Sequence, residues 1–365
     1  MSTASAARDL LTCKNSKLAS HSAPCFLGAV FFTPHARCAC MMPAAIPDAF
    51  FHIRRLNPKR DLNDVANLIE DAFSLKGDPE GVWVLRQMRA YAARANSYPA
   101  FLELPGAPDG FVWEENGKII ANISLVNYPQ ADKQIILIAN VAVAQDFRRR
   151  GIASALARHA LRFISQRPRA EVWLQVRSDN QAAIRLYSAF AFEFVHALSQ
   201  WRWEPARLFP GRISASLSKG PRVGARKIRD WKFQKTWLAQ NYPAQTRWYL
   251  NANPDYFSPW AFLIPSAWQT LPALRHLALR EAEELMGVLT WQKTSLSADQ
   301  LWLALPDNRH EDARAAALLQ ALQEKMQPTR PLVLEYPLGK AQLGIQSAGF
   351  SLARNLDWMK LNSPL

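Results

Sequence analysis

The sequence predicts an α/β protein in which mixed β-sheets are flanked by helices and divided between two similar lobes. Two observations carry this prediction. Apolar, strand-like runs alternate with amphipathic helical patterns along most of the chain. The order of these patterns in the second half repeats the order in the first. With 365 residues, the chain is long enough for two domains that each bury a core.

The first lobe begins with a short strand at 51–56 and two helical patterns at 61–73 and 82–95. The stretch 110–126 then predicts a hairpin, because the turn signal Glu115-Asn116-Gly117 separates two strand-like runs. The remaining expected elements are an almost wholly apolar strand at 133–145, typical of a strand covered on both faces, a helix at 151–166, a strand at 170–178, a helix at 180–190 and two strands within 192–205.

The same order returns after residue 270, which favours a duplicated unit over two unrelated α/β halves. The sequence predicts a first domain at 49–205, a basic linker at 206–228 and a second domain at 229–365. The repeated elements are a hairpin at 275–293, a strand at 299–306, a helix at 310–326, a strand at 331–337 and a helix followed by strands at 340–361.

Composition limits the class of protein. The chain is 49% hydrophobic and 20% charged, as expected of a globular protein, and no apolar window is long enough to span a membrane, so we expect a cytoplasmic protein without a membrane partner. All four cysteines lie in the first 40 residues, which excludes a disulfide framework for the rest of the chain. Together with His21 and His35 they match no common zinc module, so no metal is predicted. Residues 1–48 are expected to be disordered. They have two interpretations: a weakly transit-peptide-like extension, or a segment that precedes the true translation start at Met41 or Met42.

The stretch VAVAQDFRRRGIASALARHALRFI (141–164) predicts an anion site. Three arginines, Arg148, Arg149 and Arg150, stand directly before a helix whose N-terminal end already carries partial positive charge. A bound phosphate would remove this conflict, because Gly151 lets the backbone approach a ligand and the first N–H groups of a helix lack internal acceptors. A solvated basic loop is the alternative.

A second motif, NQAAIRLYSAFAF (180–192), places Asn180, Ala183 and Tyr187 on one helix face, with Asp179 or Asn180 as the cap. RRRGIA resembles the acyl-CoA pyrophosphate loop of the GNAT acetyltransferase superfamily, and the second motif resembles the helix that follows it. Ala191 departs from the glycine usual in that pattern.

The resemblance implies acetyl-CoA as cosubstrate and assigns roles to this sequence. Backbone groups of Val141 and Val143 would pair with the pantetheine arm. Asn180 would hydrogen-bond the cosubstrate near its thioester, and Tyr187 would protonate the departing thiolate; a core aromatic is the other interpretation of Tyr187. The implied cosubstrate-binding set also contains Arg148, Arg149, Arg150, Gly151, Ile152, Ala153, Ser154 and Ala183.

The acceptor is expected to be a primary amine, either a peptide α-amine or a small molecule, that attacks directly in a ternary complex. The segment around 174–192 is particularly similar to the ribosomal-protein alanine N-acetyltransferase branch. Asn140 stands where a carboxylate often acts as base, and Glu114, Glu115 and Glu193 remain open as alternatives. A monomer or a homodimer is expected.

The second lobe is expected to be a degenerate copy without a cosubstrate site. In the aligned repeat, Ile345 occupies the position of Tyr187 and Leu338 that of Asn180. The acidic Glu311 and Asp312 occupy the position of the phosphate loop. Two other functions stay open. The chain could be a CoA-binding sensor without turnover, or a nucleic-acid-associated protein that uses the basic, tryptophan-rich segment 201–248, although ordinary packing of these tryptophans is favoured over base stacking.

Overall fold

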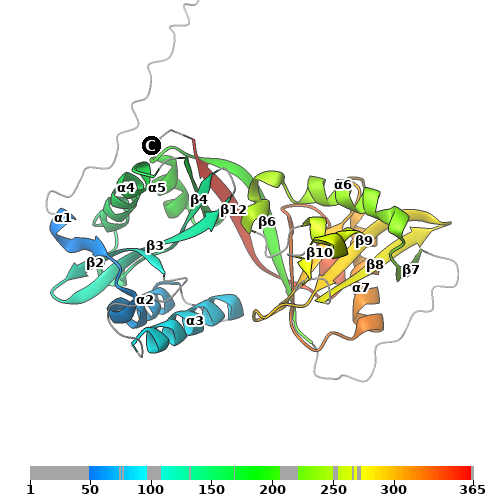
Figure 1. Cartoon of the computed structure of the whole chain (residues 1–365), viewed down its shortest axis with the longest axis horizontal. Coiled ribbons are helices and arrows are strands. Elements are labelled where there is room, and N and C mark those ends of the chain that lie inside the picture. Colours follow the sequence, from blue (N-terminus) through cyan, green and yellow to red (C-terminus); the bar gives the residue numbers. More distant parts are fainter. Residues whose placement is uncertain are drawn as a thin grey trace, which may run out of the picture. The chain divides into compact units, whose positions relative to one another are not determined.

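The computed structural model describes residues 49–362 except 74, 76, 77, 97–107, 131, 132, 168, 206–220, 250–253, 265, 266 and 269–272 (Figure 1). The expectations for residues 1–48, with the four cysteines, and for most of the basic linker lie outside the described residues. The described residues belong to one compact unit, which begins at Met41.

The first lobe follows the order of elements that the sequence predicts. Its hairpin turns at Asn116 and Gly117, both with positive φ, as the turn signal requires. In chain order, with η for 3-10 helices, its elements are α1 (Ala49–His52), β1 (Ile53–Arg55), α2 (Pro58–Phe73), α3 (Pro79–Asn96), β2 (Asp109–Glu115), β3 (Lys118–Pro129), β4 (Gln134–Val143), η1 (Gln145–Phe147), α4 (Ile152–Ser165), β5 (Ala170–Arg177), α5 (Gln181–Ser188) and β6 (Phe192–Trp203).

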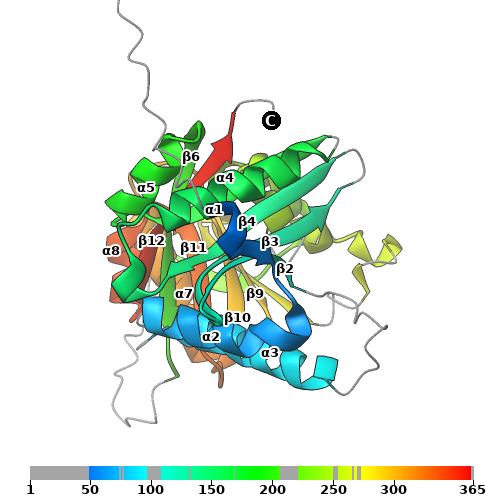
Figure 2. The same ribbon diagram turned by 90° about the vertical axis from the view of Figure 1, so that its left-hand side faces the viewer.

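Helices cover both faces of this sheet (Figure 2). α4 and α5 lie on one face, where Leu156 and Tyr187 share a core with Ile136 and Leu174 of the central strands. α2 and α3 lie on the other face and pack against Val112 and its neighbours. Strand β4 is therefore covered on both sides by helices, and the second face of β5 packs with Trp248 and Trp358, which explains their nearly unbroken apolar sequences.

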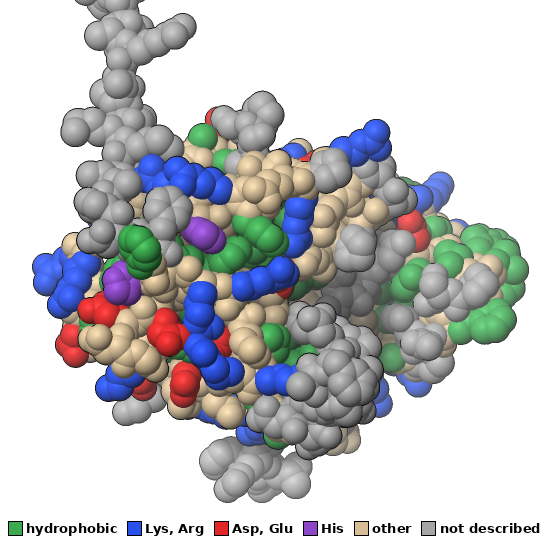
Figure 3. Space-filling model, turned by 60° about the vertical axis from the view of Figure 1, so that its left-hand side comes forward, with side chains coloured by type: hydrophobic (Ala, Val, Ile, Leu, Met, Phe, Trp, Pro, Cys, Tyr) green, Lys and Arg blue, Asp and Glu red, His purple; other side chains and the backbone are tan. Residues whose placement is uncertain are grey.

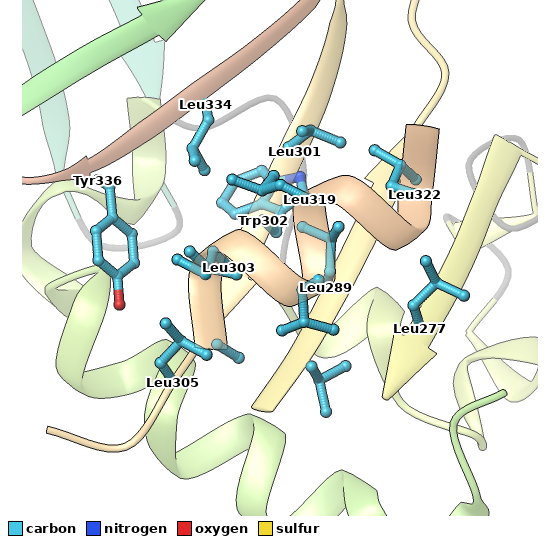
Figure 4. Packing of buried hydrophobic residues seen from close by; sticks show 14 of the residues in the cluster. Leu277, Leu289, Leu301, Trp302, Leu303, Leu305, Leu319, Leu322, Leu334 and Tyr336 are labelled. Carbon is cyan, nitrogen blue, oxygen red and sulfur yellow. The ribbon is translucent and has the colours of Figure 1, made fainter. Parts of the chain in front are cut away.

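The second lobe repeats this plan, and leucines from its strands and from α7 fill its core (Figure 4). Its first strand begins at Arg222, within the range 206–228 that the sequence predicts as a linker. Its elements are β7 (Arg222–Ala225), η2 (Ile228–Asp230), α6 (Trp231–Asn241), η3 (Ala244–Tyr249), η4 (Pro254–Phe257), η5 (Ala261–Leu263), β8 (Leu274–Glu281), β9 (Glu284–Gln292), β10 (Asp299–Ala304), α7 (Glu311–Met326), β11 (Leu332–Pro337), α8 (Gln342–Ser347) and β12 (Ser351–Leu361).

The two lobes exchange their last strands. All twelve strands form one sheet in the order β1-β2-β3-β4-β5-β12-β6-β11-β10-β9-β8-β7, which reads as two equivalent halves. The final strand β12 pairs with β5 of the first lobe, and β6 pairs with β11 of the second, while β6 and β12 pair antiparallel with each other. Each lobe's sheet is thus completed by a strand from the other lobe (Figure 1).

This exchange accounts for the clearest differences from the sequence-based expectations. The sequence predicts two strands within 192–205 and more than one after the helix near 340, but each region forms a single long strand, β6 and β12. A local hairpin in either region is replaced by pairing across the chain. Strand propensity identifies the strands, whereas the choice of partner depends on segments at least 129 residues away.

Candidate active site

The loop before α4 forms a left-handed turn that exposes the start of the helix. Gly151 is the N-cap residue of α4, with φ 78° and ψ 2°, and no side chain caps the helix there. A residue with a Cβ atom is strained in this conformation, so the glycine is required by the turn. Arg149 also has a positive φ of 63°, which is unusual for a non-glycine residue. The turn thus leaves the first N–H groups of α4 without a side-chain acceptor.

The three arginines of this loop differ in what they contact. Arg148 donates from Nε to the Val143 carbonyl at 3.0 Å and from a terminal nitrogen to the Ala72 carbonyl at 3.3 Å. Arg150 donates to the Asp146 carbonyl at 3.0 Å, and its guanidinium lies 4.9 Å from the centre of the Phe147 ring. These two side chains stabilise the turn itself. Arg149 forms no hydrogen bond or ion pair with any described residue, which leaves it available for an anion.

The first turn of α4 carries an unused hydroxyl. Ser154 is only 7% exposed, and its Oγ has no hydrogen-bond partner within the described residues. Ile152 beside it is buried in the core and fixes the helix against the sheet. A buried hydroxyl without a partner costs free energy, so a ligand with acceptor oxygens would suit this end of the helix. Ala153 between them is half-buried and leaves room.

Strands β4 and β5 separate next to this helix end. Their parallel pairing stops at Ile138 and Leu174, although β4 continues to Val143 and β5 to Arg177. The cause lies in β4, where Asn140 has a φ of 49° and the register with β3 shifts. Val141 and Val143 follow this bulge, so their backbone groups face a strand that no longer pairs with them. A gap of this kind offers hydrogen bonds to an extended ligand.

The buried side-chain amide of Asn122 holds the bulge in place. Asn122 is not among the site residues predicted from the sequence. The Asn122 side chain is fully buried in β3 and donates to the Asn140 carbonyl at 2.9 Å and to Ser124 Oγ at 3.1 Å. The signal in the sequence is an asparagine and a serine within the apolar run 119–126. Polar residues inside an apolar strand indicate a backbone irregularity that needs a partner.

Helix α5 places Asn180 and Tyr187 in different environments. Asn180 caps the helix, since its side chain accepts a hydrogen bond from the Ala183 N–H at 3.1 Å, and it is otherwise exposed. Of the two caps that the sequence allows, Asp179 pairs instead with Arg177 at 2.7 Å. Tyr187 is 6% exposed and packs edge-on against Phe192, with ring centres 5.7 Å apart. Burial raises the pKa of Tyr187 well above its ordinary value, so its phenol keeps the proton at neutral pH.

The three glutamates that the sequence leaves open as the general base differ in the contacts that their side chains make. Glu114 accepts hydrogen bonds from Arg54 at 2.6 Å and from Arg60, so its carboxylate is neutralised. Glu115 lies opposite Lys118 at the hairpin turn. Glu193 is exposed on β6 and accepts a hydrogen bond from Asn362. None of these contacts positions a carboxylate for proton abstraction.

Two other polar residues lie where β5 leaves β4. Gln175 follows Leu174, the last residue of β5 that pairs with β4, and its Nε2 is buried without a partner among the described residues. Asp357 of β12 is the register partner of Val176, and Ser178 Oγ donates to its carboxylate at 2.5 Å. Asp357 reaches this place only through the strand exchange, so no local sequence pattern could have identified it.

The equivalent position in the second lobe is filled by protein. The Gly344 N–H at the start of α8 donates to Asp312 in the first turn of α7 at 2.8 Å, and a Cβ on Gly344 would lie 2.0 Å from the Asp312 carbonyl oxygen. Burial raises the pKa of Glu311 beside it. The N-cap of α8 is Ala341, and Leu338, which the sequence sets against Asn180, lies between β11 and this helix. Ile345 is buried in the core.

The tryptophans of 201–248 pack in or against the hydrophobic cores. Trp201 is 1% exposed and lies in the second core, with Trp203, Trp231 and Trp237 packed against it. Trp248 packs against Tyr128, Trp173 and neighbouring rings. On the face drawn in Figure 3, Lys and Arg side chains are interspersed with Asp and Glu. The tryptophans therefore do not form an exposed platform for stacking bases.

The described part of the chain also bears on metals and membranes. No group of three or more metal-ligating side chains occurs among the described residues. No helix within them is long and apolar enough to cross a membrane.

Comparison with known proteins places this site in a family. The family model described as Acetyltransferase (GNAT) family matches residues 63–192. The ribosomal protein bS18 alanine N-acetyltransferase of Escherichia coli is 35% identical over 86 residues, which cover 22% of this chain and 53% of that enzyme. Its counterpart from Salmonella typhimurium is 31% identical over 108 residues, which cover 26% of this chain and 73% of that enzyme.

The fold of both lobes together also has a known counterpart. A GCN5-related N-acetyltransferase from Sphaerobacter thermophilus aligns with a TM-score of 0.54 over 87% of this chain and 96% of that one, at 16% identity. At this identity the likeness supports the two-lobed fold and no more. The alignable sequence spans about half the length of the Escherichia coli enzyme. The match over 73% of the Salmonella enzyme, together with the family model, shows that this chain belongs to the GNAT acetyltransferase family.

Proposed function

We propose that the chain transfers the acetyl group of acetyl-CoA to a primary amine by direct attack in a ternary complex. The observation that carries the proposal is the early end of the β4–β5 pairing beside an uncapped helix start. The gap can take an extended pantetheine arm, and the helix start can take a pyrophosphate. Members of this family use acetyl-CoA, and both features suit that molecule.

Different residues of the first lobe bind different parts of acetyl-CoA. Backbone groups of Val141 and Val143 pair with the pantetheine amides. The N–H groups from Arg149 to Ser154 surround the pyrophosphate, Ser154 Oγ donates to it, and the Arg149 guanidinium supplies a charge-assisted contact. Arg148 and Arg150 act indirectly, because their contacts hold the turn in the shape that exposes these groups. Ile152 and Ala153 present the helix start, and Asn180 and Ala183 form the start of the neighbouring helix.

Chemistry then requires one proton to leave the amine and one to reach the departing sulfur. The neutral amine nitrogen forms a bond to the thioester carbon as the carbon–sulfur bond breaks. Tyr187 gives its phenolic proton to the thiolate and regains one from solvent. A phenol is protonated at neutral pH, so Tyr187 has a proton to give when the sulfur departs. An α-amine of pKa about 8 is partly neutral at physiological pH, so solvent can accept the amine proton without a dedicated carboxylate.

A peptide α-amine is the acceptor we propose, because the curated relatives are named as alanine N-acetyltransferases of a ribosomal protein. The lower pKa of an α-amine favours it over a lysine side chain, whose pKa is about 10.4. The second lobe is proposed to complete the sheet without binding CoA, since α8 occupies the space at the N-terminal end of α7.

The test is an acetyl-transfer assay with the full chain. Purified protein is incubated with acetyl-CoA and three peptides: one with a free N-terminal alanine, the same peptide blocked at its N-terminus, and the blocked peptide with an added lysine. Release of free CoA and a mass increase of one acetyl group are expected with the first peptide alone. Binding of CoA without transfer to any amine would instead identify a sensor.

A further inference from the structure

A second feature of the protein is a cavity of about 110 Å³. Residues of α6, η3 and the strands β6, β11 and β12 line it. Neither the anion loop nor helices α4 and α5 contribute to its wall. A cavity that holds benzene in an engineered protein measures about 150 Å³, so this one can hold a group of a few non-hydrogen atoms.

Several aromatic side chains contribute to the wall. Tyr242, Tyr249, Tyr336 and Trp358 all line the cavity. Tyr249 and Trp358 meet edge-on with centres 4.8 Å apart, and His196 stacks on Trp358 at 6.3 Å. Tyr336 stands at the edge of the leucine cluster of the second lobe (Figure 4). Rings held in fixed positions around a small space present their negative faces to a cation.

One carboxylate faces this aromatic wall without a cation of its own. Glu335 of β11 is 7% exposed and is the only acidic residue among the described residues that line the cavity. It accepts a hydrogen bond from Gln200 Nε2 at 3.2 Å, but no cationic side chain among the described residues forms an ion pair with it. A buried, unpaired carboxylate is costly unless a ligand supplies the missing charge.

The nearby arginines are already neutralised by other acids. Arg354 donates to Asp78 at 2.8 and 3.2 Å and to Gln200 Oε1 at 2.7 Å. Arg202 pairs with Glu80. Each guanidinium is therefore committed to α3 or to the segment before it, and neither forms an ion pair with Glu335.

Three further polar atoms at the cavity have no partner within the described chain. They are Asn241 Oδ1, Tyr336 Oη and His196 Nδ1. The Asn241 amide nitrogen is used, since it donates to the Leu305 carbonyl at 3.2 Å, so its oxygen is left as an acceptor. Asn241 is 3% exposed and Tyr336 1% exposed, so solvent does not satisfy them. A protonated primary amine has three N–H donors and no acceptor, which matches a carboxylate and the neutral amide oxygen of Asn241.

We propose that this cavity binds the protonated amino group of a primary alkylamine, with Glu335 as its counter-ion. The ammonium donates to Glu335 and to Asn241 Oδ1, and the rings of Tyr249 and Trp358 cover its alkyl part. A carboxylate keeps the amine protonated, whereas an attacking amine must be neutral. The cavity is therefore a separate binding site and does not hold the amine that is acetylated.

The binding depends on pH through one group. Burial raises the pKa of Glu335 to about 6. The charged and titratable groups that face it are Arg354 from β12, Glu80 from α3, Tyr249 from η3 and Tyr242 at the end of α6. Burial lowers the pKa of His196 on β6, so it remains neutral as Glu335 loses its proton. Affinity for the ammonium is expected to fall at least tenfold between pH 8 and pH 5.

The test uses the full chain without acetyl-CoA, so its result is independent of acetyl transfer. Ligand-observed NMR titrations compare ethylammonium chloride with 1-propanol, its neutral counterpart, at pH 8 and constant ionic strength. Saturable binding of ethylammonium alone is expected. Glu335→Gln should weaken it at least tenfold. Glu324→Gln removes an exposed carboxylate from α7 of the same lobe and should leave the affinity unchanged.

Three results would overturn the proposal: absence of saturable ethylammonium binding, equal affinity for 1-propanol, or equal ethylammonium affinity in Glu335→Gln. Equal or tighter binding of tetramethylammonium would also contradict it, because that ion has no N–H donors. Thermal unfolding of each variant checks that it is folded before its affinity is compared.

Discussion

Ser178 Oγ donates a hydrogen bond to the Asp357 carboxylate at 2.5 Å, although the two residues are 179 positions apart in the chain. Ser178 follows the last residue of β5, and Asp357 comes from β12, the final strand of the second lobe. The site of the first lobe is therefore bordered by a strand from the other end of the chain. A lobe cut at the predicted linker would lack this strand.

The strand exchange predicts that a core substitution near the C-terminus destabilises the first lobe. Met359 of β12 is 3% exposed and lies in the core that contains α4 and α5. Met359→Ala should cost about 2–5 kcal/mol, because it leaves a cavity in that core. Hydrogen exchange of the α4 amides should accelerate accordingly. Leu352→Ala on the same strand, where the side chain is 43% exposed, serves as the control and should change little. Unchanged α4 protection in Met359→Ala would contradict the exchanged arrangement.

Gly151→Val is expected to abolish CoA binding, since the side chain would strain the left-handed turn and block the helix start. Isothermal titration calorimetry with CoA measures this directly. Gly117→Val is the matched control, because Gly117 has a similar φ of 74° in the β2–β3 turn with nothing within 4 Å of an added Cβ. It should carry the same backbone strain and still bind CoA. Comparable CoA affinity in both variants would remove the anion loop from the proposal.

Tyr187→Phe removes only a hydroxyl from a buried ring and should preserve packing against Phe192. If Tyr187 protonates the thiolate, turnover should fall about 10²–10⁴-fold, the usual contribution of a general acid, while CoA affinity stays within a factor of about two. Steady-state kinetics and CoA titration on the same sample separate the two quantities. Wild-type turnover in this variant would leave Tyr187 as a core aromatic.

Asp61 holds the start of α2 against β1 and predicts a pH-dependent contribution to stability. Its buried carboxylate accepts hydrogen bonds from Arg54 at 2.6 and 3.0 Å and from the Asn57 N–H at 2.7 Å. Burial alone would raise the pKa of Asp61, but these bonds outweigh it and leave the pKa below its ordinary value of 3.8. Its contribution is therefore present above about pH 4 and lost as the pH falls through the lowered value.

Asp61→Asn should reduce the free energy of unfolding by about 3 kcal/mol at pH 7 and by less near pH 3, measured by urea denaturation. The control is Glu70→Gln, which breaks the exposed pair between Glu70 and Arg89 and should cost less than about 1 kcal/mol. Equal losses in the two variants at pH 7 would argue against a buried network around Asp61.

The contribution of Glu335 to the free energy of unfolding depends on pH in the opposite direction. Its pKa in the folded chain is about 6, above the ordinary 4.5, so the folded state holds this proton more tightly than the unfolded state does. The resulting stabilisation is complete below pH 4.5 and disappears as the pH rises through 6. Glu335→Gln should therefore raise the free energy of unfolding by about 2 kcal/mol at pH 8, relative to its effect at pH 4.5, in urea titrations of the amine-free protein. A variant equally destabilised at both pH values would mean that Glu335 is satisfied within the protein.

Local sequence determined much of this protein because the information needed was itself local. The period of apolar residues identifies α4 and the central strands, Asn116 and Gly117 specify the β2–β3 turn, and Gly151 with the arginines before it indicates the anion loop. Each depends on the backbone preferences or burial of a few neighbouring residues. The second occurrence of the same pattern also predicts the second lobe and its order of elements.

Only the tertiary structure decided which strands pair and which polar groups meet. The neighbours of β12 are fixed by packing, since Met359 completes the first core while Leu352 stays exposed, and strand propensity alone cannot distinguish β5 from any other partner. Asp357 at the β5 end and Glu335 in the aromatic cavity owe their positions to that pairing. Their charges are ordinary in the sequence, and they become distinctive only where burial and distant neighbours determine what each carboxylate can bind.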